Sequence, residues 1–230
     1  MSRSIKVRSL YIRIDTVMKN DSLTIADVAS LLKRAGFTPS ETELEALTGY
    51  LTLVMKWNKV MNLVGPYSWQ DVLTILIIDS LYLNQFLRSL SLPSTPVTWD
   101  FGAGAGLPGI PLRALWQEGE YYLVDVREKR AMFMEQTVKR LQIPNTNVYK
   151  GRVENFMEEH EPADLMLSRA FMPWKKLLEL VGPNIKSQGR IVVLALEPVP
   201  TDLTEGWSVE KEISYKVGKD TRYFWSLIKA

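Results

Sequence analysis

Trp99-Asp100-Phe101-Gly102-Ala103-Gly104-Ala105-Gly106-Leu107-Pro108-Gly109 places an acidic residue and three alternating glycines at the end of a short apolar run. Glycines permit positive φ angles and let backbone N–H groups approach a ligand that any Cβ would push away. The G-x-G-x-G spacing differs from the G-x-G-x-x-G pattern of dinucleotide-binding loops, in which a helix N-terminus receives a pyrophosphate. A turn that needs glycines only for its backbone shape is the competing interpretation. We favour a loop that binds a nucleotide-like cofactor through its backbone.

From residue 97 onward, short apolar runs alternate with helical patterns. The runs at 97–101, 121–126, 147–150, 164–168 and 190–196 are predicted strands, and the patterns at 108–116, 129–141 and 174–181 are predicted helices. Such alternation predicts an α/β fold, a parallel sheet with helices on both faces. Two further alternating runs, at 207–215 and 222–228, predict a C-terminal hairpin that closes one edge of the sheet with an antiparallel strand.

Helical periodicity covers most of the chain before residue 91. Patterns at 22–35 and 68–90 repeat apolar residues at helical spacing. Ser40 is a predicted N-cap, with Glu43 in capping-box position, of another helix that continues through Val54. We therefore expect an N-terminal helical extension over residues 1–66 and an α/β domain over residues 67–230, which together form one compact unit.

The composition limits what kind of protein this is. The 230 residues are 46% hydrophobic, enough for a sizeable core. With 28 basic and 26 acidic residues, binding to nucleic acid requires a local patch rather than the field of the whole protein. The absence of cysteine excludes disulfides, thiolate zinc sites and thiol nucleophiles, and no run of about 18 apolar residues predicts a membrane span. We expect a cytoplasmic, monomeric protein without a metal.

The predicted sheet places further candidate residues beside the glycine loop, because ligands bind open α/β sheets beyond the carboxyl ends of the strands. Asp125 ends the second strand, where its carboxylate can accept both hydroxyls of a ribose. It could instead cap the following helix, and the glycine loop upstream makes ribose binding the favoured role. After the third strand, Val153 and Glu154 belong to a loop that either faces the base of the nucleoside or simply leads into a helix.

Arg169 follows the fourth predicted strand, whose carboxyl end points at the reacting group in this architecture. Its guanidinium offers a planar fork of donors that suits a phosphate, a carboxylate or a guanine edge. A salt bridge to Asp79 or Glu197 is the structural alternative. In either role Arg169 would lie at the rim of the pocket.

Several motifs resemble one family in order along the chain. They are Lys56-Trp57-Asn58, Asn62-Leu63, Asp79-Ser80-Leu81, the loop from Asp100 through Leu112, Gly151-Arg152-Val153-Glu154 and Ser168-Arg169-Ala170. Together they look like the bacterial small-subunit ribosomal RNA guanine-N7 methyltransferases, also known as glucose-inhibited division protein B. The glycine loop itself resembles motif I of S-adenosylmethionine-dependent methyltransferases, where it passes under the methionine part of the donor.

The resemblance implies a Rossmann-like methyltransferase domain that uses S-adenosyl-L-methionine to methylate a guanine N7 in 16S ribosomal RNA or the small ribosomal subunit. By position it implies donor contacts at Gly102, Leu107, Val153, Glu154 and Arg169. We add Asp100, Gly104, Gly106 and Asp125 as donor-binding candidates, and Arg169 as the catalytic candidate.

The chain departs from the family pattern at two places. The family usually has an Arg-His pair ahead of Asp-Ser-Leu, where this chain has Ile75 and Leu76. The family usually has Leu-Lys-Gly after the fifth strand, where this chain has Leu196, Glu197 and Pro198. Both changes remove positive charge from the side expected to meet RNA, and both leave the glycine loop intact.

The chemistry implied by the family needs few catalytic groups. Guanine N7 carries a lone pair and no proton, so that methyl transfer needs no general base and depends largely on positioning. RNA could be held by basic and aromatic side chains that are otherwise solvated charges or core aromatics: Arg127, Lys129, Arg130, Arg152, Phe171 and Trp174. The alternatives are a methyltransferase of the same fold acting on another RNA or a small molecule, and a donor-binding module without turnover.

Overall fold

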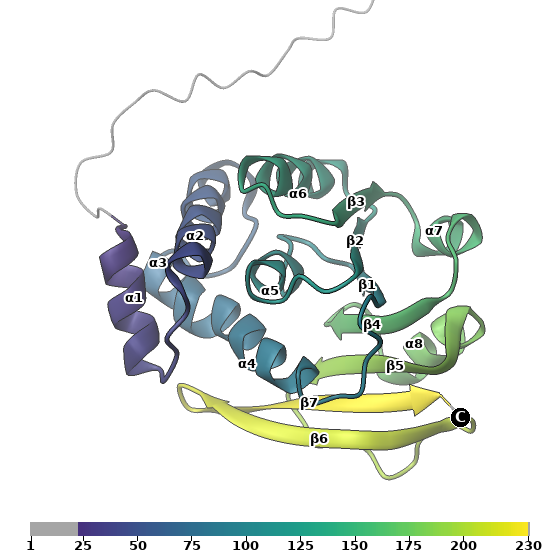
Figure 1. The fold of residues 1–230 in the computed structure, drawn as a ribbon. Coiled ribbons are helices and arrows are strands. Elements are labelled where there is room, and N and C mark those ends of the chain that lie inside the picture. The colour runs from purple at the N-terminus through teal and green to yellow at the C-terminus, as the bar shows by residue number, and fades with distance from the viewer. Residues whose placement is uncertain (1–22, 230) are drawn as a thin grey trace, which may run out of the picture.

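A seven-stranded sheet in the order β3-β2-β1-β4-β5-β7-β6 organises the computed structural model, which describes residues 23–229 (Figure 1). The strands are β1 (Val97–Phe101), β2 (Glu120–Asp125), β3 (Thr146–Lys150), β4 (Ala163–Arg169), β5 (Ile185–Ala195), β6 (Trp207–Val217) and β7 (Asp220–Lys229). The strands β1 to β5 pair in parallel, and the hairpin β6–β7 joins β5 in antiparallel direction. The chain order reverses between β1 and β4, which is where ligands bind in such sheets.

Helices cover both faces of this sheet. They are α1 (Ile25–Arg34), α2 (Glu41–Met61), α3 (Trp69–Asp71), the π-helix η1 (Val72–Ile77), α4 (Ile78–Leu87), α5 (Gly109–Leu115), α6 (Glu128–Arg140), α7 (Val153–Glu159), α8 (Trp174–Val181) and the 3₁₀ turn η2 (Gly182–Asn184). Alternate strand residues divide the core: Leu165 and Leu167 pack with α1, α2, α4, α5 and α6, whereas Met166 packs with α7 and α8. The predicted fold class, with helices on both faces and an antiparallel edge, is confirmed.

Local capping explains where the first helices begin. Thr24 caps α1 with Asp27, and Ser40 caps α2 with Glu43, whose carboxylate accepts the Ser40 backbone N–H at 2.7 Å. The helix α2 ends at Asn62, a residue in the left-handed conformation with φ of 50°. Asn58 closes the loop beyond by accepting the Val64 N–H at 2.9 Å. The predicted start of α2 at Ser40 and Glu43 is confirmed.

The helix predicted over 68–90 is confirmed from Trp69 through Leu87, but it contains a π-helical stretch that the sequence did not indicate. The segment consists of α3, η1 and α4, because the Ile78 N–H bonds to the Leu73 carbonyl across a π turn. The segment contains no proline or glycine, so its sequence carries no sign of the wider turn. The other strands and helices lie within a few residues of their predicted bounds, except that β5 begins at Ile185 rather than at residue 190.

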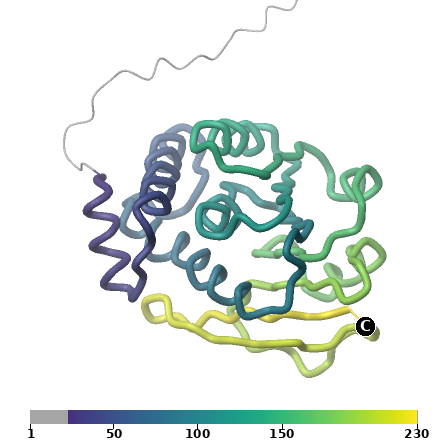
Figure 2. The backbone as a smooth tube through the Cα atoms, in the orientation of Figure 1, coloured from purple at the N-terminus to yellow at the C-terminus, as the bar shows by residue number. Residues whose placement is uncertain are grey.

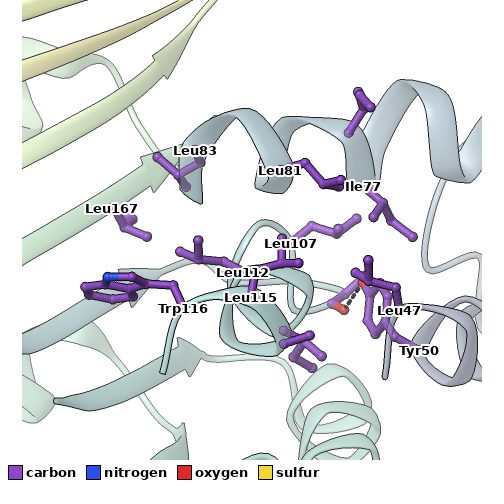
Figure 3. Packing of buried hydrophobic residues seen from close by; sticks show 14 of the residues in the cluster. Leu47, Tyr50, Ile77, Leu81, Leu83, Leu107, Leu112, Leu115, Trp116 and Leu167 are labelled. Carbon is purple, nitrogen blue, oxygen red and sulfur yellow. Dashed lines mark hydrogen bonds between the residues drawn. The ribbon is translucent and has the colours of Figure 1, made fainter. Parts of the chain in front are cut away.

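The helices α1 and α2 share their core with the sheet. Leu47, Tyr50, Leu51 and Val54 of α2 belong to the same buried cluster as Leu112 of α5. Figure 2 shows these N-terminal helices beside α4, α5 and α6, and Figure 3 shows Leu47 and Tyr50 next to the leucines of α4 and α5. Residues 1–22 of the predicted extension lie outside the described part of the chain.

Candidate site for a methyl donor and RNA

The glycine loop follows β1 at the point where the strand order reverses. Gly102, Gly104 and Gly106 have φ angles of 69°, 63° and 76°, a region that side-chain-bearing residues rarely adopt. The loop is anchored from several sides: Gly102 N–H bonds to the Val124 carbonyl at 2.9 Å, and the Tyr50 hydroxyl donates to the Ala105 carbonyl at 2.8 Å. The loop is therefore a fixed part of the core.

The three glycines serve different purposes. A Cβ on Gly106 would collide with the side chain of Ile110, so this glycine is required by packing within the fold. A Cβ on Gly102 would lie 2.6 Å from the ring of Phe171, and one on Gly104 would lie 2.7 Å from the Nη1 of Arg130. The side chains over Gly102 and Gly104 are half-buried, whereas Ile110 is fully buried, so the space over the first two glycines lies nearer the surface.

Asp100 and Leu107 lie below these glycines. Asp100 is 1% exposed and accepts a hydrogen bond from the Tyr121 hydroxyl at 3.0 Å. Burial raises the pKa of Asp100 from 3.8 to about 7, against the lowering effect of hydrogen bonds from Tyr121 and the Gly109 N–H. Leu107 packs in the buried cluster. The structure therefore places both residues as supports of the loop.

Asp125 presents its carboxylate to the glycine loop. Its Oδ2 accepts the Gly104 N–H at 2.9 Å, and its Oδ1 accepts the Arg127 N–H at 2.9 Å. The Arg127 guanidinium adds two bonds of 3.0 Å, from Nε to Oδ1 and from Nη2 to Oδ2. Burial raises the pKa of Asp125, but the bonds from Arg127 and Gly104 outweigh it and hold the pKa below its ordinary value.

Arg169 forms the salt bridge that was its structural alternative. Its Nη2 lies 3.1 Å from the Oδ2 of Asp79, which is buried in α4. Two residues of the C-terminal hairpin share this carboxylate: Arg222 donates at 2.6 and 2.7 Å, and the Tyr215 hydroxyl donates at 2.9 Å. Sequence analysis missed both residues, because they lie more than 130 residues from Asp79. Only the packing of the C-terminal hairpin against α4 brings them to this carboxylate.

The loop after β3 runs beside Asp125. The Gly151 N–H bonds to the Asp125 carbonyl at 3.3 Å, and Arg152, which is exposed, precedes α7. Val153 is buried in the α7 layer, whereas Glu154 is exposed in the first turn of the helix. The structure thus places the backbone of this loop, rather than the Val153 side chain, toward the edge where Asp125 lies.

The RNA-binding candidates gather where helices begin at the carboxyl edge of the sheet. Lys129 is exposed and Arg130 half-buried in the first turn of α6. Phe171 is half-buried after β4 and meets the Phe101 ring edge-on, with 6.0 Å between centroids. Trp174, at the start of α8, is half-buried and carries the Lys175 ammonium 5.2 Å from its ring centroid. Exposed cations and reachable aromatic rings therefore flank the glycine loop.

The residues present fit an S-adenosylmethionine-like donor. Gly102 and Gly104 form a backbone cradle, and Asp125 supplies a hydrogen-bonded carboxylate at its rim. Within residues 23–229, no group of three or more His, Asp or Glu side chains could hold a metal ion. No helix among these residues is long and apolar enough to cross a membrane.

A cleft of about 860 Å³ lies at the opposite edge of the sheet. It is bordered by the start of α2, the end of α5 and the loops that precede β2 and β3. Arg113 in its wall is fully buried and donates to the backbone carbonyls of residues 116, 118 and 144. The cleft contains none of the predicted site residues, and its buried cation is already satisfied by the fold.

Solved structures support the fold. A proposed O-methyltransferase from Klebsiella pneumoniae superposes with a TM-score of 0.58 at 10% identity, covering 89% of this chain and 97% of that one. The proposed methyltransferase yhhF from Escherichia coli gives 0.51 at 18% identity, covering 66% and 86%. At such identities the likeness concerns the fold alone.

Sequence relatives are much closer. The protein named ribosomal RNA small subunit methyltransferase G in Nitratidesulfovibrio vulgaris (strain DP4) is 52% identical over 201 residues, covering 87% of this chain and 92% of that protein. The protein of the same name in Lawsonia intracellularis is 46% identical over 208 residues, covering 90% and 96%. The family model described as rRNA small subunit methyltransferase G matches residues 43–212. The chain belongs to the rRNA small subunit methyltransferase G family.

Proposed function

We propose that this protein transfers a methyl group from S-adenosyl-L-methionine to N7 of a guanine in 16S ribosomal RNA. The observation that carries the proposal is the pairing of a glycine cradle with Asp125 in a chain of the rRNA small subunit methyltransferase G family. When bound, the donor supplies an electrophilic methyl group on a sulfonium centre. Asp125 would accept its ribose hydroxyls, and the cradle of Gly102 and Gly104 would contact its methionine part.

The protein's own contribution is positioning. N7 of guanine offers a lone pair without a proton, so no side chain has to remove one. Holding two reactants in line can supply roughly 7 to 11 kcal/mol of barrier reduction. We assign Arg169, at the end of β4, to the acceptor side. Its guanidinium is bound by Asp79 of α4, and 22% of the Arg169 side chain is still exposed. Phe171, over Gly102, would stack on the unpaired base.

A guanidinium lies beside the departures at Ile75 and Leu76, but its charge is paired with Asp79. Arg222 of β7 donates to the Ile75 carbonyl at 2.6 Å and to Asp79. A guanidinium therefore lies beside the segment where the family usually carries its Arg-His pair. Because this guanidinium is 12% exposed and bonded to both oxygens of Asp79, it does not replace the missing cations, and RNA is favoured as the acceptor by the family membership alone.

The test is methylation of small ribosomal subunits that lack the modification. Purified protein, isotope-labelled donor and unmodified 30S particles should give labelled N7-methylguanine at one position of the 16S RNA, mapped by cleavage at that base. Asp125→Asn should reduce donor binding and labelling together. Label on another base, or donor binding without label on any RNA, would contradict the proposal.

A further inference from the structure

The carboxylate of Asp125 has no acceptor capacity left in the structure. A carboxylate offers about four lone-pair sites, and four donors fill them: two backbone N–H groups and two nitrogens of the Arg127 guanidinium. The two hydroxyls of a ribose would need acceptor sites on the same oxygens. Ribose binding by Asp125 therefore requires that existing donors leave.

Only the Arg127 side chain is free to leave. The Gly104 N–H belongs to the loop anchored by Tyr50 and Val124, and the Arg127 N–H is fixed where α6 begins. The Arg127 side chain, in contrast, is 54% exposed, and its guanidinium donates its hydrogen bonds to Asp125, which is 1% exposed. When the guanidinium leaves, the two backbone N–H groups of Gly104 and Arg127 still bond to the Asp125 carboxylate, which is therefore not left without partners.

We propose that Arg127 is a displaceable latch, which occupies the ribose-binding oxygens of Asp125 in the free protein and is released by the methyl donor to bind an RNA phosphate. The inference rests on the proposed function and adds that binding of the donor favours binding of the RNA. Donor binding unmasks one more cation on the RNA side, and by thermodynamic reciprocity RNA binding strengthens donor binding by the same factor.

The surroundings of Arg127 favour a phosphate as its second partner. Lys129 is exposed two residues further along α6, and Arg130 lies over Gly104. Burial, and secondarily the nearby charge of Arg127, lowers the pKa of Arg130. A released Arg127 is therefore drawn to an anion outside the site, and its planar fork matches phosphate oxygens.

The first experiment measures donor-site affinity without catalysis. Calorimetry with S-adenosylhomocysteine should show Arg127→Met binding roughly two- to fivefold more tightly than the natural protein, since the competing ion pair is gone. Lys129→Met, the matched loss of a charge that does not touch Asp125, should leave this affinity unchanged. Equal or weaker binding by Arg127→Met would overturn the latch. Arg127→Lys, which keeps the charge without the bidentate fork, serves as the second variant if Arg127→Met folds poorly.

The second experiment measures coupling to RNA. Titration of a labelled 16S RNA fragment should show tighter binding when S-adenosylhomocysteine is present, with the slope of log K against log salt steeper by about 0.7 to 0.9, one added phosphate contact. Lys129→Met should bind RNA more weakly yet keep this increment. Arg127→Met should lose it. An increment that persists in Arg127→Met would overturn the proposal.

The failures of the two proposals are distinguishable. Asp125→Asn that still binds S-adenosylhomocysteine normally would show that the donor site has been misassigned, and the proposed function would lose its main support. Asp125→Asn that loses binding, combined with no effect of Arg127→Met, would leave the donor site standing and remove only the latch.

Discussion

At the scale of single residues, one loop combines glycines required by packing with glycines that we propose contact the donor. Gly106 is needed because Ile110 packs against it, and Gly109 because Asp100 and Tyr121 lie where its Cβ would be. Gly104 differs, since the atom that its Cβ would clash with is the terminal nitrogen of the half-buried Arg130. Alanine at any glycine of positive φ causes a similar backbone strain. A comparison of two such substitutions therefore isolates the effect of the added Cβ on donor binding.

Gly104→Ala should abolish donor binding while costing only about 1 to 2 kcal/mol of stability, the strain of a side chain at positive φ. Gly218→Ala is the matched control: Gly218 has φ of 59°, and its Cβ would meet nothing within 4 Å. Calorimetry with S-adenosylhomocysteine and thermal unfolding of both variants check the prediction. Similar donor affinity in the two variants would refute the cradle assigned to Gly104.

Asp100 makes stability depend on pH in a defined direction. The folded protein raises the pKa of this carboxyl from 3.8 to about 7, chiefly through burial, so it holds a proton that the unfolded chain has released. This contribution therefore lowers the free energy of unfolding as pH rises from about 4 to 7. Asp100→Asn stays neutral and should gain stability relative to the natural protein between pH 5 and pH 8, by roughly 3 kcal/mol, since only the part of the effect between pH 5 and about 7 falls in this range. Denaturant titrations at the two pH values measure this difference, and a constant difference would contradict the assignment.

At the scale of elements, one carboxylate joins four segments that are distant in sequence. Asp79 of α4 meets Arg169 of β4, Tyr215 of β6 and Arg222 of β7. The contact holds the C-terminal hairpin against α4 and fixes the end of β4, where the acceptor is proposed to bind. We therefore expect Arg222 and Tyr215 to serve stability and Arg169 to serve methyl transfer as well.

Arg222→Met should destabilise the fold more than Arg169→Met. Arg222 makes both short bonds to Asp79 and is 12% exposed, whereas Arg169 makes one contact at 3.1 Å and is 22% exposed. Asp79→Ala should be the most severe change, at about 3 to 5 kcal/mol, because it strands two guanidinium groups. Thermal unfolding ranks the three variants. Methyl transfer should fall in Arg169→Met well beyond its loss of folded protein; activity that merely follows the folded fraction would make Arg169 structural only.

Local features of this fold could be predicted from the sequence, whereas contacts such as those of Asp79 could not. Ser40 and Glu43 predicted the start of α2 because a capping box is local, and the glycines predicted their loop because positive φ is a property of single residues. The π turn η1 has no such local pattern. The partners of Asp79 and the bond from Arg127 to Asp125 depend on side-chain placement, which composition and periodicity do not determine.

At the scale of the whole molecule, the N-terminal helices are part of the catalytic fold. Leu51 of α2 is fully buried in the cluster that also contains Leu112 of α5 and Phe224 of β7. Tyr50 bonds to the Ala105 carbonyl within the glycine loop. A boundary at residue 66 therefore separates segments of sequence that share one hydrophobic core, and unfolding of α2 would expose the base of the proposed donor site.

Unfolding should accordingly be one cooperative transition that includes α2. Leu51→Ala creates a cavity in the shared core and should cost about 2 to 5 kcal/mol, moving the denaturant midpoints of helix circular dichroism and tryptophan fluorescence by the same amount. Leu177→Ala, on the opposite face with α8, should do likewise, because Leu177 is fully buried in the other cluster. Two separate midpoints in Leu51→Ala, with the helix signal lost first, would show that the extension folds as its own unit. A single shifted midpoint with unchanged slope would mean that the donor site forms only when the N-terminal helices are in place, since the loop and its Tyr50 support unfold together.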